Sequence, residues 1–169
     1  MSDADAARPD AAPPIQGVRL ALDWGQARIG VAACDARGTL AHPVETLNAR
    51  DRGQVLARLR ALVAEYEPTG FVLGLPRHLN GHEGVNARLV RDSAAWLAAQ
   101  FPEVDVRLVD ERLTTVTASA QLRAAGRTAR QQRGVIDQAA AVAILTAALD
   151  TERATGRRAG EPINERTPE

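Results

Sequence analysis

The sequence predicts an α/β protein in which helices cover both faces of a mixed β-sheet. From residue 51 onwards, short apolar runs typical of strands alternate with segments whose apolar residues recur at helical spacing. Before them, two strand-like runs are joined by a short polar turn and a third run follows, which is typical of antiparallel pairing. Because strand–helix–strand crossovers favour parallel pairing, the sheet should contain both kinds of pair.

The three antiparallel strands are expected at residues 18–22, 28–34 and 38–44, with Gly25 in the first turn. Residues 51–65 then show helical spacing at Val55, Leu59 and Leu62. The elements expected after this helix are a buried strand at 71–76, an amphipathic helix at 86–101, an alternating strand at 104–109, and helices at 115–125 and 135–149. The sheet should therefore have five strands.

The 169 residues, 45% of them apolar, correspond to one domain with its own core. Residues 1–16 and 151–169 lack periodicity and predict disordered tails, which leaves residues 17–150 as the domain. The single cysteine, Cys34, cannot form an internal disulfide and reads as a small apolar strand residue. No secretory signal is visible, and no uninterrupted apolar run approaches the roughly 18–20 residues of a membrane span. We therefore expect a cytoplasmic protein.

The 21 basic and 21 acidic residues balance, which argues against a general polyanion binder but leaves room for a local basic patch. Residues 122–134 are such a candidate, because they contain four arginines and no acid. They could hold a phosphate backbone, or they could be a solvated linker. With only two Trp, two Phe and one Tyr, recognition of the backbone is favoured over base stacking.

Three acids occupy positions typical of a functional site. Asp23 ends the first strand, Glu111 follows the strand at 104–109, and Asp137 lies in the expected first turn of the last helix. Ligands of open α/β sheets bind outside the carboxyl ends of the strands. If the first strand and the strand at 104–109 are neighbours, the three carboxylates converge there.

Converging carboxylates repel one another unless a cation lies between them. Mg²⁺ prefers such oxygen ligands, and two ions about 3.5–4 Å apart can activate a water and stabilise the leaving oxygen of a phosphodiester. Each acid also has a simpler interpretation when taken alone. Asp23 could be a turn residue, Glu111 a helix-terminal acid or a partner of Arg112, and Asp137 the solvent edge of a helix. The histidines at 78 and 82 have a spacing used by zinc ligands, but the Asn-Gly turn between them argues against a zinc site.

Four stretches, in this order, resemble the YqgF/RuvX family of pre-16S rRNA nucleases, which are related to Holliday-junction resolvases of the RNase H-like superfamily. They are LALDWGQARIGVAACD at 20–35, VLGLPRHLNGHEG at 72–84, VDERLTT at 109–115 and IDQAAAVAIL at 136–145. The resemblance covers residues 17–150. It implies an RNase H-like mixed five-stranded sheet whose first three strands are antiparallel.

The resemblance also implies that Asp23, Glu111 and Asp137 are the catalytic residues and the ligands of Mg²⁺, with Mn²⁺ as a substitute. The family usually has a basic residue directly before Arg-Ile-Gly, where this chain has Ala27, so a phosphate contact there would depend on Arg28 alone. The residues that we expect to bind nucleic acid are Arg28, Arg112, Arg127, Arg130 and Arg133.

The expected function is a metal-dependent nuclease that processes the 5′ end of precursor 16S rRNA during ribosome biogenesis. Its partners would be RNA and the ribosome or its precursors, and it would act as a monomer or weak homodimer without a membrane. A Holliday-junction resolvase acting on branched DNA and a non-catalytic RNA-binding factor on the same fold are alternatives. An actin-like ATPase also places an acid and a glycine beside a hairpin, but it needs a second domain that this chain is too short to supply.

Overall fold

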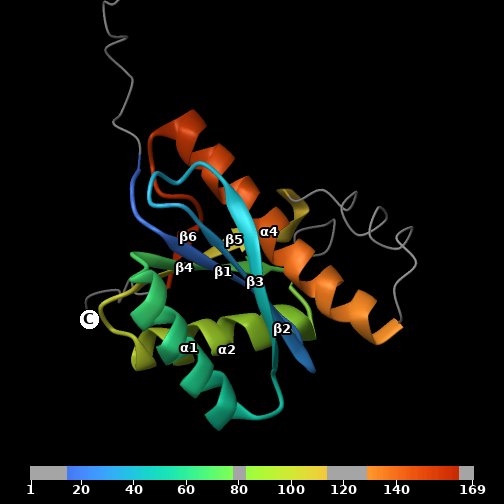
Figure 1. Cartoon of the computed structure of the whole chain (residues 1–169). Helices are drawn as coiled ribbons and strands as arrows, with labels where there is room; N and C mark the ends of the chain where they lie inside the picture. Colours follow the sequence, from blue (N-terminus) through green and yellow to red (C-terminus); the bar gives the residue numbers. More distant parts are fainter. Residues whose placement is uncertain (1–14, 78–82, 114–128, 164–169) are drawn as a thin grey trace, which may run out of the picture.

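The computed structural model describes residues 15–77, 83–113 and 129–163. Within them, a six-stranded sheet with the order β3-β2-β1-β4-β5-β6 lies between two layers of helix. Helices α1 and α2 lie together on one face and α4 crosses the other (Figure 1). The predicted α/β class and mixed sheet are confirmed, but the sheet has one strand more than the five expected.

The antiparallel half of the sheet consists of β1 (Arg19–Trp24), β2 (Arg28–Cys34) and β3 (Ala41–Asn48). The third strand begins later than predicted because residues 35–40 form a turn. In this turn Gly38 has a φ of 67°, and the carboxylate of Asp35 accepts the backbone N–H groups of Thr39 and Leu40. The register between β2 and β3 shifts by one residue beside Pro43, because Val31 lies opposite Glu45 and Ala32 opposite Pro43, and an edge strand tolerates this irregularity.

The parallel half adds β4 (Gly70–Leu75) and β5 (Asp105–Asp110). β1 and β5 are not neighbours, the condition on which the predicted convergence of the acids depends, because β4 lies between them and pairs in parallel with both. All three strands nevertheless run in the same direction. Their carboxyl ends, and the residues that follow them, therefore meet at one edge of the sheet.

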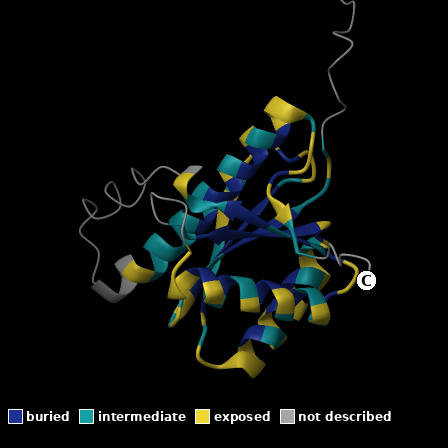
Figure 2. Ribbon diagram, turned by 180° about the vertical axis from the view of Figure 1, so that it is seen from behind, coloured by how far each residue is buried: buried dark blue, intermediate teal, exposed yellow. Residues whose placement is uncertain are grey.

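Helices α1 (Arg52–Tyr66) and α2 (Val85–Gln100) bury their apolar sides against one face of the sheet, as Figure 2 shows by the contrast between dark-blue strands and yellow outer helix surfaces. Asp51 caps α1 by accepting the backbone N–H of Gln54 at 3.1 Å. Leu20, Leu22 and Phe71 on the strands are completely buried beneath these helices. This layer is the larger part of the core.

Helix α4 (Ala129–Thr155) covers the other face, and it begins before the predicted residue 135. The strand residues beneath it are small, among them Ala21 and Ala32, and they pack against Ile144 and Leu145. Its part Arg133–Thr155 is long and apolar enough, by length and composition, to cross a membrane. Its buried side chains, among them Ala141, Ile144 and Leu145, contact the sheet, so core packing accounts for part of the apolar character of α4.

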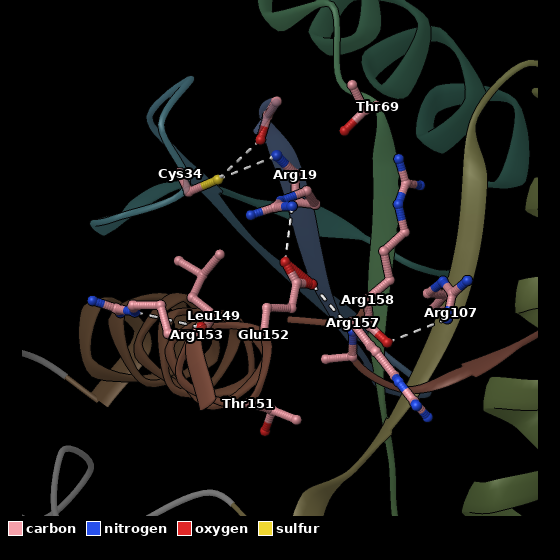
Figure 3. A network of polar contacts seen from close by, with 12 residues as sticks. Arg19, Cys34, Thr69, Arg107, Leu149, Thr151, Glu152, Arg153, Arg157 and Arg158 are labelled. Atoms are coloured by element: carbon pink, nitrogen blue, oxygen red, sulfur yellow. Dashed lines mark hydrogen bonds and ion pairs between the residues drawn. The ribbon is translucent and has the colours of Figure 1, made fainter. Parts of the chain in front are cut away.

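The predicted disordered tail at 151–169 is wrong for its described part. Helix α4 continues to Thr155, and β6 (Glu161–Pro162) adds a sixth strand beside β5. Figure 3 shows what fixes this segment: Glu152 forms a buried ion pair with Arg19 of β1, with 2.9 Å between Oε1 and NH1, and accepts the backbone N–H of Ala159. The predicted helix at 115–125, the histidines at 78 and 82, and residues 1–14 and 164–169 lie outside the described residues.

Candidate active site

Asp23 lies at the end of β1 on the face that α4 covers, two residues after the buried Ala21. Its cross-strand partner is Gly30 of β2, and this glycine determines how closely α4 approaches. A Cβ atom at Gly30 would overlap the backbone carbonyl of Asp137. The glycine therefore allows the Asp137 backbone of α4 to lie directly on β2, beside Asp23.

Glu111 begins the short 3-10 helix η2 (Glu111–Leu113) directly after β5. Although β4 separates β5 from β1, the residue of β4 that lies beside Glu111 is a glycine, Gly74. A Cβ atom at Gly74 would lie 3.0 Å from Cγ of Glu111 and 2.6 Å from Cδ1 of Ile144. The absence of a side chain at Gly74 thus leaves space above β4 for both Glu111 and α4.

The three acids influence one another electrostatically. Burial raises the pKa of Asp23 to about 7, and the negative charges of Glu111 and Asp137 add to the effect. Burial also raises the pKa of Glu111, with a further contribution from Asp110. A negative charge on Asp23 is therefore unfavourable in the free protein.

Asp137 forms an ion pair with Arg28 of β2, in which Nε donates to Oδ2 at 2.7 Å. The surrounding part of α4 is fixed to β3, because Thr46 donates to the carbonyl of Gly134 at 2.8 Å and accepts from Gln138 at 3.1 Å. Asp137 was expected in the first turn of its helix, but α4 begins at Ala129, so Asp137 lies deeper in the helix. A glycine such as Gly134 is typical of a helix boundary, but here it lies inside α4, so the sequence does not reveal where the helix starts.

The predicted arginines have different positions. Arg112 donates from its backbone, from Nε and from NH2 to Asp110, with 2.7 Å between NH2 and Oδ2. This contact lowers the pKa of Asp110. Arg133 is exposed on α4. The side chain of Arg130 and the whole of Arg127 lie outside the described residues.

Three residues that the sequence did not point to are Gly30, Gly74 and Thr46. They help to position the acids but are not themselves expected to take part in the reaction. The glycine in LGLP and the one in RIGVA were visible signals, since a glycine inside a strand often marks a close approach of another backbone. The partner of each could not be inferred from one sequence. The contact of Arg28 with Asp137 also required the fold.

The three carboxylates offer only oxygen donors, the type that Mg²⁺ and Mn²⁺ prefer. A cation would also relieve the unfavourable charge on Asp23, so the donor chemistry fits a divalent metal. The side-chain arrangement of the free protein is different: among the described residues, no group of three or more His, Cys, Asp or Glu side chains is arranged to hold a metal ion. A metal bound by Asp137 would have to compete with Arg28.

The family model described as RuvX, Holliday junction resolvase, matches residues 17–151. A protein of Streptomyces coelicolor named "Putative pre-16S rRNA nuclease" is 57% identical over 148 residues, which cover 88% of this chain and 89% of the relative. A protein of Cutibacterium acnes with the same name is 54% identical over 148 residues, covering 88% of this chain and 90% of the relative.

Among solved structures, RuvC of Thermus thermophilus in complex with a Holliday junction substrate matches with a TM-score of 0.55 and 15% sequence identity. The match covers 86% of this chain and 98% of that chain. At this identity the similarity concerns the fold, and it confirms the RNase H-like arrangement predicted from the sequence. The family match and the close relatives also confirm the predicted assignment to a family of nucleases: this chain belongs to the RuvX family.

Proposed function

We propose that this protein is a metal-dependent nuclease that cleaves phosphodiester bonds of precursor 16S rRNA near its 5′ end. The observation that carries this proposal is the coupling of Asp23 with Glu111 and Asp137. Three carboxylates from distant parts of the chain meet at the carboxyl edge of the sheet, and their proximity together with burial raises the pKa of Asp23 to about 7. Such an unfavourable grouping is typical of a site that binds cations.

Asp23, Glu111 and Asp137 would hold one or two Mg²⁺ ions, with Mn²⁺ as a substitute. The metal would supply Lewis-acid chemistry for activating water and for stabilising the leaving oxygen. The protein would contribute orientation: Gly30 and Gly74 allow α4 and Glu111 to approach Asp23. Arg28 would contact a substrate phosphate once its contact with Asp137 is released.

The RNA substrate is supported by the names of the relatives that are more than half identical to this chain. Arg112, Arg127, Arg130 and Arg133 are proposed to hold the RNA backbone. A family that acts on precursor rRNA would work with the ribosome or its precursors, and we propose a monomer or weak homodimer for that task.

The proposal is tested by cleavage of end-labelled RNA that spans the 5′ end of mature 16S rRNA, with Mg²⁺, Mn²⁺ or EDTA. The wild type should cut the RNA only with metal, and Asp23→Asn should lose at least about 100-fold in rate, because one carboxylate ligand becomes an amide. Asp92→Asn is the matched control, since Asp92 is exposed on α2. Equal cleavage by wild type and Asp23→Asn would contradict the proposed site.

A Holliday-junction resolvase is the second candidate, favoured by the similarity to RuvC bound to a Holliday junction. The same assay should therefore include a four-way DNA junction. Paired, symmetric cuts in the junction together with intact RNA would replace the rRNA proposal by this one. If neither substrate is cut but the RNA is bound, a non-catalytic RNA-binding factor is the better description.

A further inference from the structure

A second group of charged residues lies at the same edge of the sheet, on the side of α2. Arg77 follows the end of β4, Arg91 lies on α2, and Glu161 lies in β6. β4 lies between β1 and β5 and runs parallel to both. Arg77, just after β4, therefore lies at the same edge of the sheet as Asp23 and Glu111. This group plays no part in the site described above.

Arg91, and Arg112 of the neighbouring acidic site, have strong acceptors. Arg91 donates to both carboxylate oxygens of Glu83, at 2.6 and 2.8 Å, which is a bidentate contact. Arg112 engages Asp110 in the same way, with distances of 3.1 and 2.7 Å. Glu83 and Asp110 are therefore already paired with arginines other than Arg77.

Arg77 itself is held weakly. Its one ion pair within the described residues joins NH2 to Oε2 of Glu161 at 3.8 Å, and the Glu161 side chain is 53% exposed and also lies 3.4 Å from Arg91. The Nε atom of Arg77 is buried and has no hydrogen-bond partner in the part of the chain that the structure describes. A long ion pair to an exposed carboxylate contributes little stability, whereas a buried donor without an acceptor is unfavourable.

The positive charge of Arg77 nevertheless affects the pKa values of two neighbouring carboxyl groups. Hydrogen bonding to Arg91 is the main cause that lowers the pKa of Glu83, and the charge of Arg77 contributes. The pKa of Asp110 is lowered mainly by Arg112 and again in part by Arg77. Glu83, just before α2, and Asp110, at the end of β5, therefore both lie in the neighbourhood of Arg77.

We propose that Arg77 binds a backbone phosphate of the RNA substrate, and that Glu161 is a weak internal acceptor which this phosphate replaces. A guanidinium group matches the geometry of a phosphate and can donate two parallel hydrogen bonds to it. The proposal rests on the proposed nuclease function. It extends the RNA-binding surface from the α4 face, where the acids lie, around the edge of the sheet to the α2 face.

The proposal predicts opposite effects for the two partners of one ion pair. Arg77→Gln should weaken RNA binding, because it removes the phosphate contact. Glu161→Gln should strengthen RNA binding, because it removes the acceptor that competes with the phosphate. If the ion pair served only to hold β6 in place, Arg77→Gln and Glu161→Gln would both break it, and the two changes would not have opposite effects on RNA binding.

The test measures binding of fluorescent single-stranded RNA from the 5′ boundary of 16S rRNA, by anisotropy, at several salt concentrations. All variants carry Asp23→Asn so that cleavage does not interfere. We expect Arg77→Gln to weaken binding about tenfold and to reduce the slope of log Kd against log salt by about 0.7, the value for one phosphate on a single strand. Glu161→Gln should tighten binding about threefold, the effect expected from removal of a weak surface ion pair.

Arg157→Gln is the matched control, because Arg157 is exposed in the segment after α4, at the opposite end of β1 from Asp23. Arg77→Lys keeps the charge and should lie between wild type and Arg77→Gln, and thermal unfolding checks that each variant is folded. If the Asp23→Asn protein binds RNA but neither Arg77→Gln nor Glu161→Gln changes its affinity, the role of Arg77 is wrong and the nuclease proposal stands. If that protein does not bind RNA at all, both proposals are wrong.

Discussion

The Nε atom of Arg28 lies 2.7 Å from Oδ2 of Asp137, and this ion pair joins β2 to α4 beside Asp23. The Arg28 side chain is 42% exposed, whereas that of Asp137 is 19% exposed. The guanidinium of Arg28 therefore approaches Asp137 from the solvent side and pairs with a carboxylate that the proposed metal site needs. In the free protein Arg28 supplies part of the positive charge that a metal would provide.

Replacing Arg28 by Gln should increase the affinity for Mn²⁺. The change removes a positive charge that competes for Asp137 and repels the incoming cation, and we expect about a tenfold decrease in Kd, or about 1.4 kcal/mol. Isothermal titration calorimetry without substrate measures this directly. Arg157→Gln is the control for the loss of one arginine, and a weaker affinity in Arg28→Gln would show that Arg28 does not compete with the metal.

Replacing Gly30 by Ala should destabilise the protein, because the new methyl group would overlap the Asp137 carbonyl and force α4 away from β2. Overpacking of this kind typically costs about 1–3 kcal/mol. Urea unfolding measures the loss. Gly53→Ala is the control: its added Cβ would have Oδ1 of Asp51, 3.6 Å away, as its nearest contact, so the free energy of unfolding should change by no more than about 1 kcal/mol.

The raised pKa of Asp23 predicts how stability depends on pH in the absence of metal. Between the ordinary value of 3.8 and about 7, folded Asp23 holds a proton that the unfolded chain has released. The folded state therefore binds more protons in this range, and the contribution of Asp23 to stability falls as pH rises. Asp23→Asn should be more stable than wild type at pH 8, by on the order of 2–4 kcal/mol, and should lose this advantage near pH 4. Urea unfolding in EDTA at both pH values measures it; an advantage that is the same at both values would contradict the assigned shift.

The buried pair of Arg19 and Glu152 predicts a large effect at the far end of α4. Both side chains are less than a tenth exposed, and NH1 and Oε1 are 2.9 Å apart (Figure 3). Glu152→Ala leaves the Arg19 charge buried without its partner, which should cost about 3–5 kcal/mol. Asp150→Ala breaks the exposed pair with Arg153 on the same helix and should cost less than about 1 kcal/mol. Equal losses in the two variants would show that the Glu152 pair is not important for stability.

The parts of the fold that depend on local patterns were predictable. Asp51 begins α1 as its cap, and α2, β4 and β5 lie within one residue of their expected bounds, because each carries its own periodicity and punctuation. The three acids could be chosen because each follows or lies within a recognisable element. These predictions needed no information about distant residues.

The remaining features depend on contacts between distant segments. The position of β4 between β1 and β5 is a matter of topology, and β6 has two residues whose pairing is made possible by β5 and by the Glu152 contacts. Gly74 is necessary because a Cβ atom there would lie too close to Glu111 and Ile144, and both residues are far away in the chain. For the same reason the ion pair of Arg28 with Asp137 could not be seen in either segment alone.

Asp23, Glu111 and Asp137 are proposed to act as one cation-binding unit. The most direct measurement is the calorimetric titration of Mn²⁺ into wild type, Asp23→Asn and the control Asp92→Asn at pH 8, above the raised pKa of Asp23. We expect wild type and Asp92→Asn to bind Mn²⁺ equally and Asp23→Asn to bind at least about 100-fold more weakly, or about 2.7 kcal/mol. Equal affinity of Asp23→Asn and wild type would contradict it.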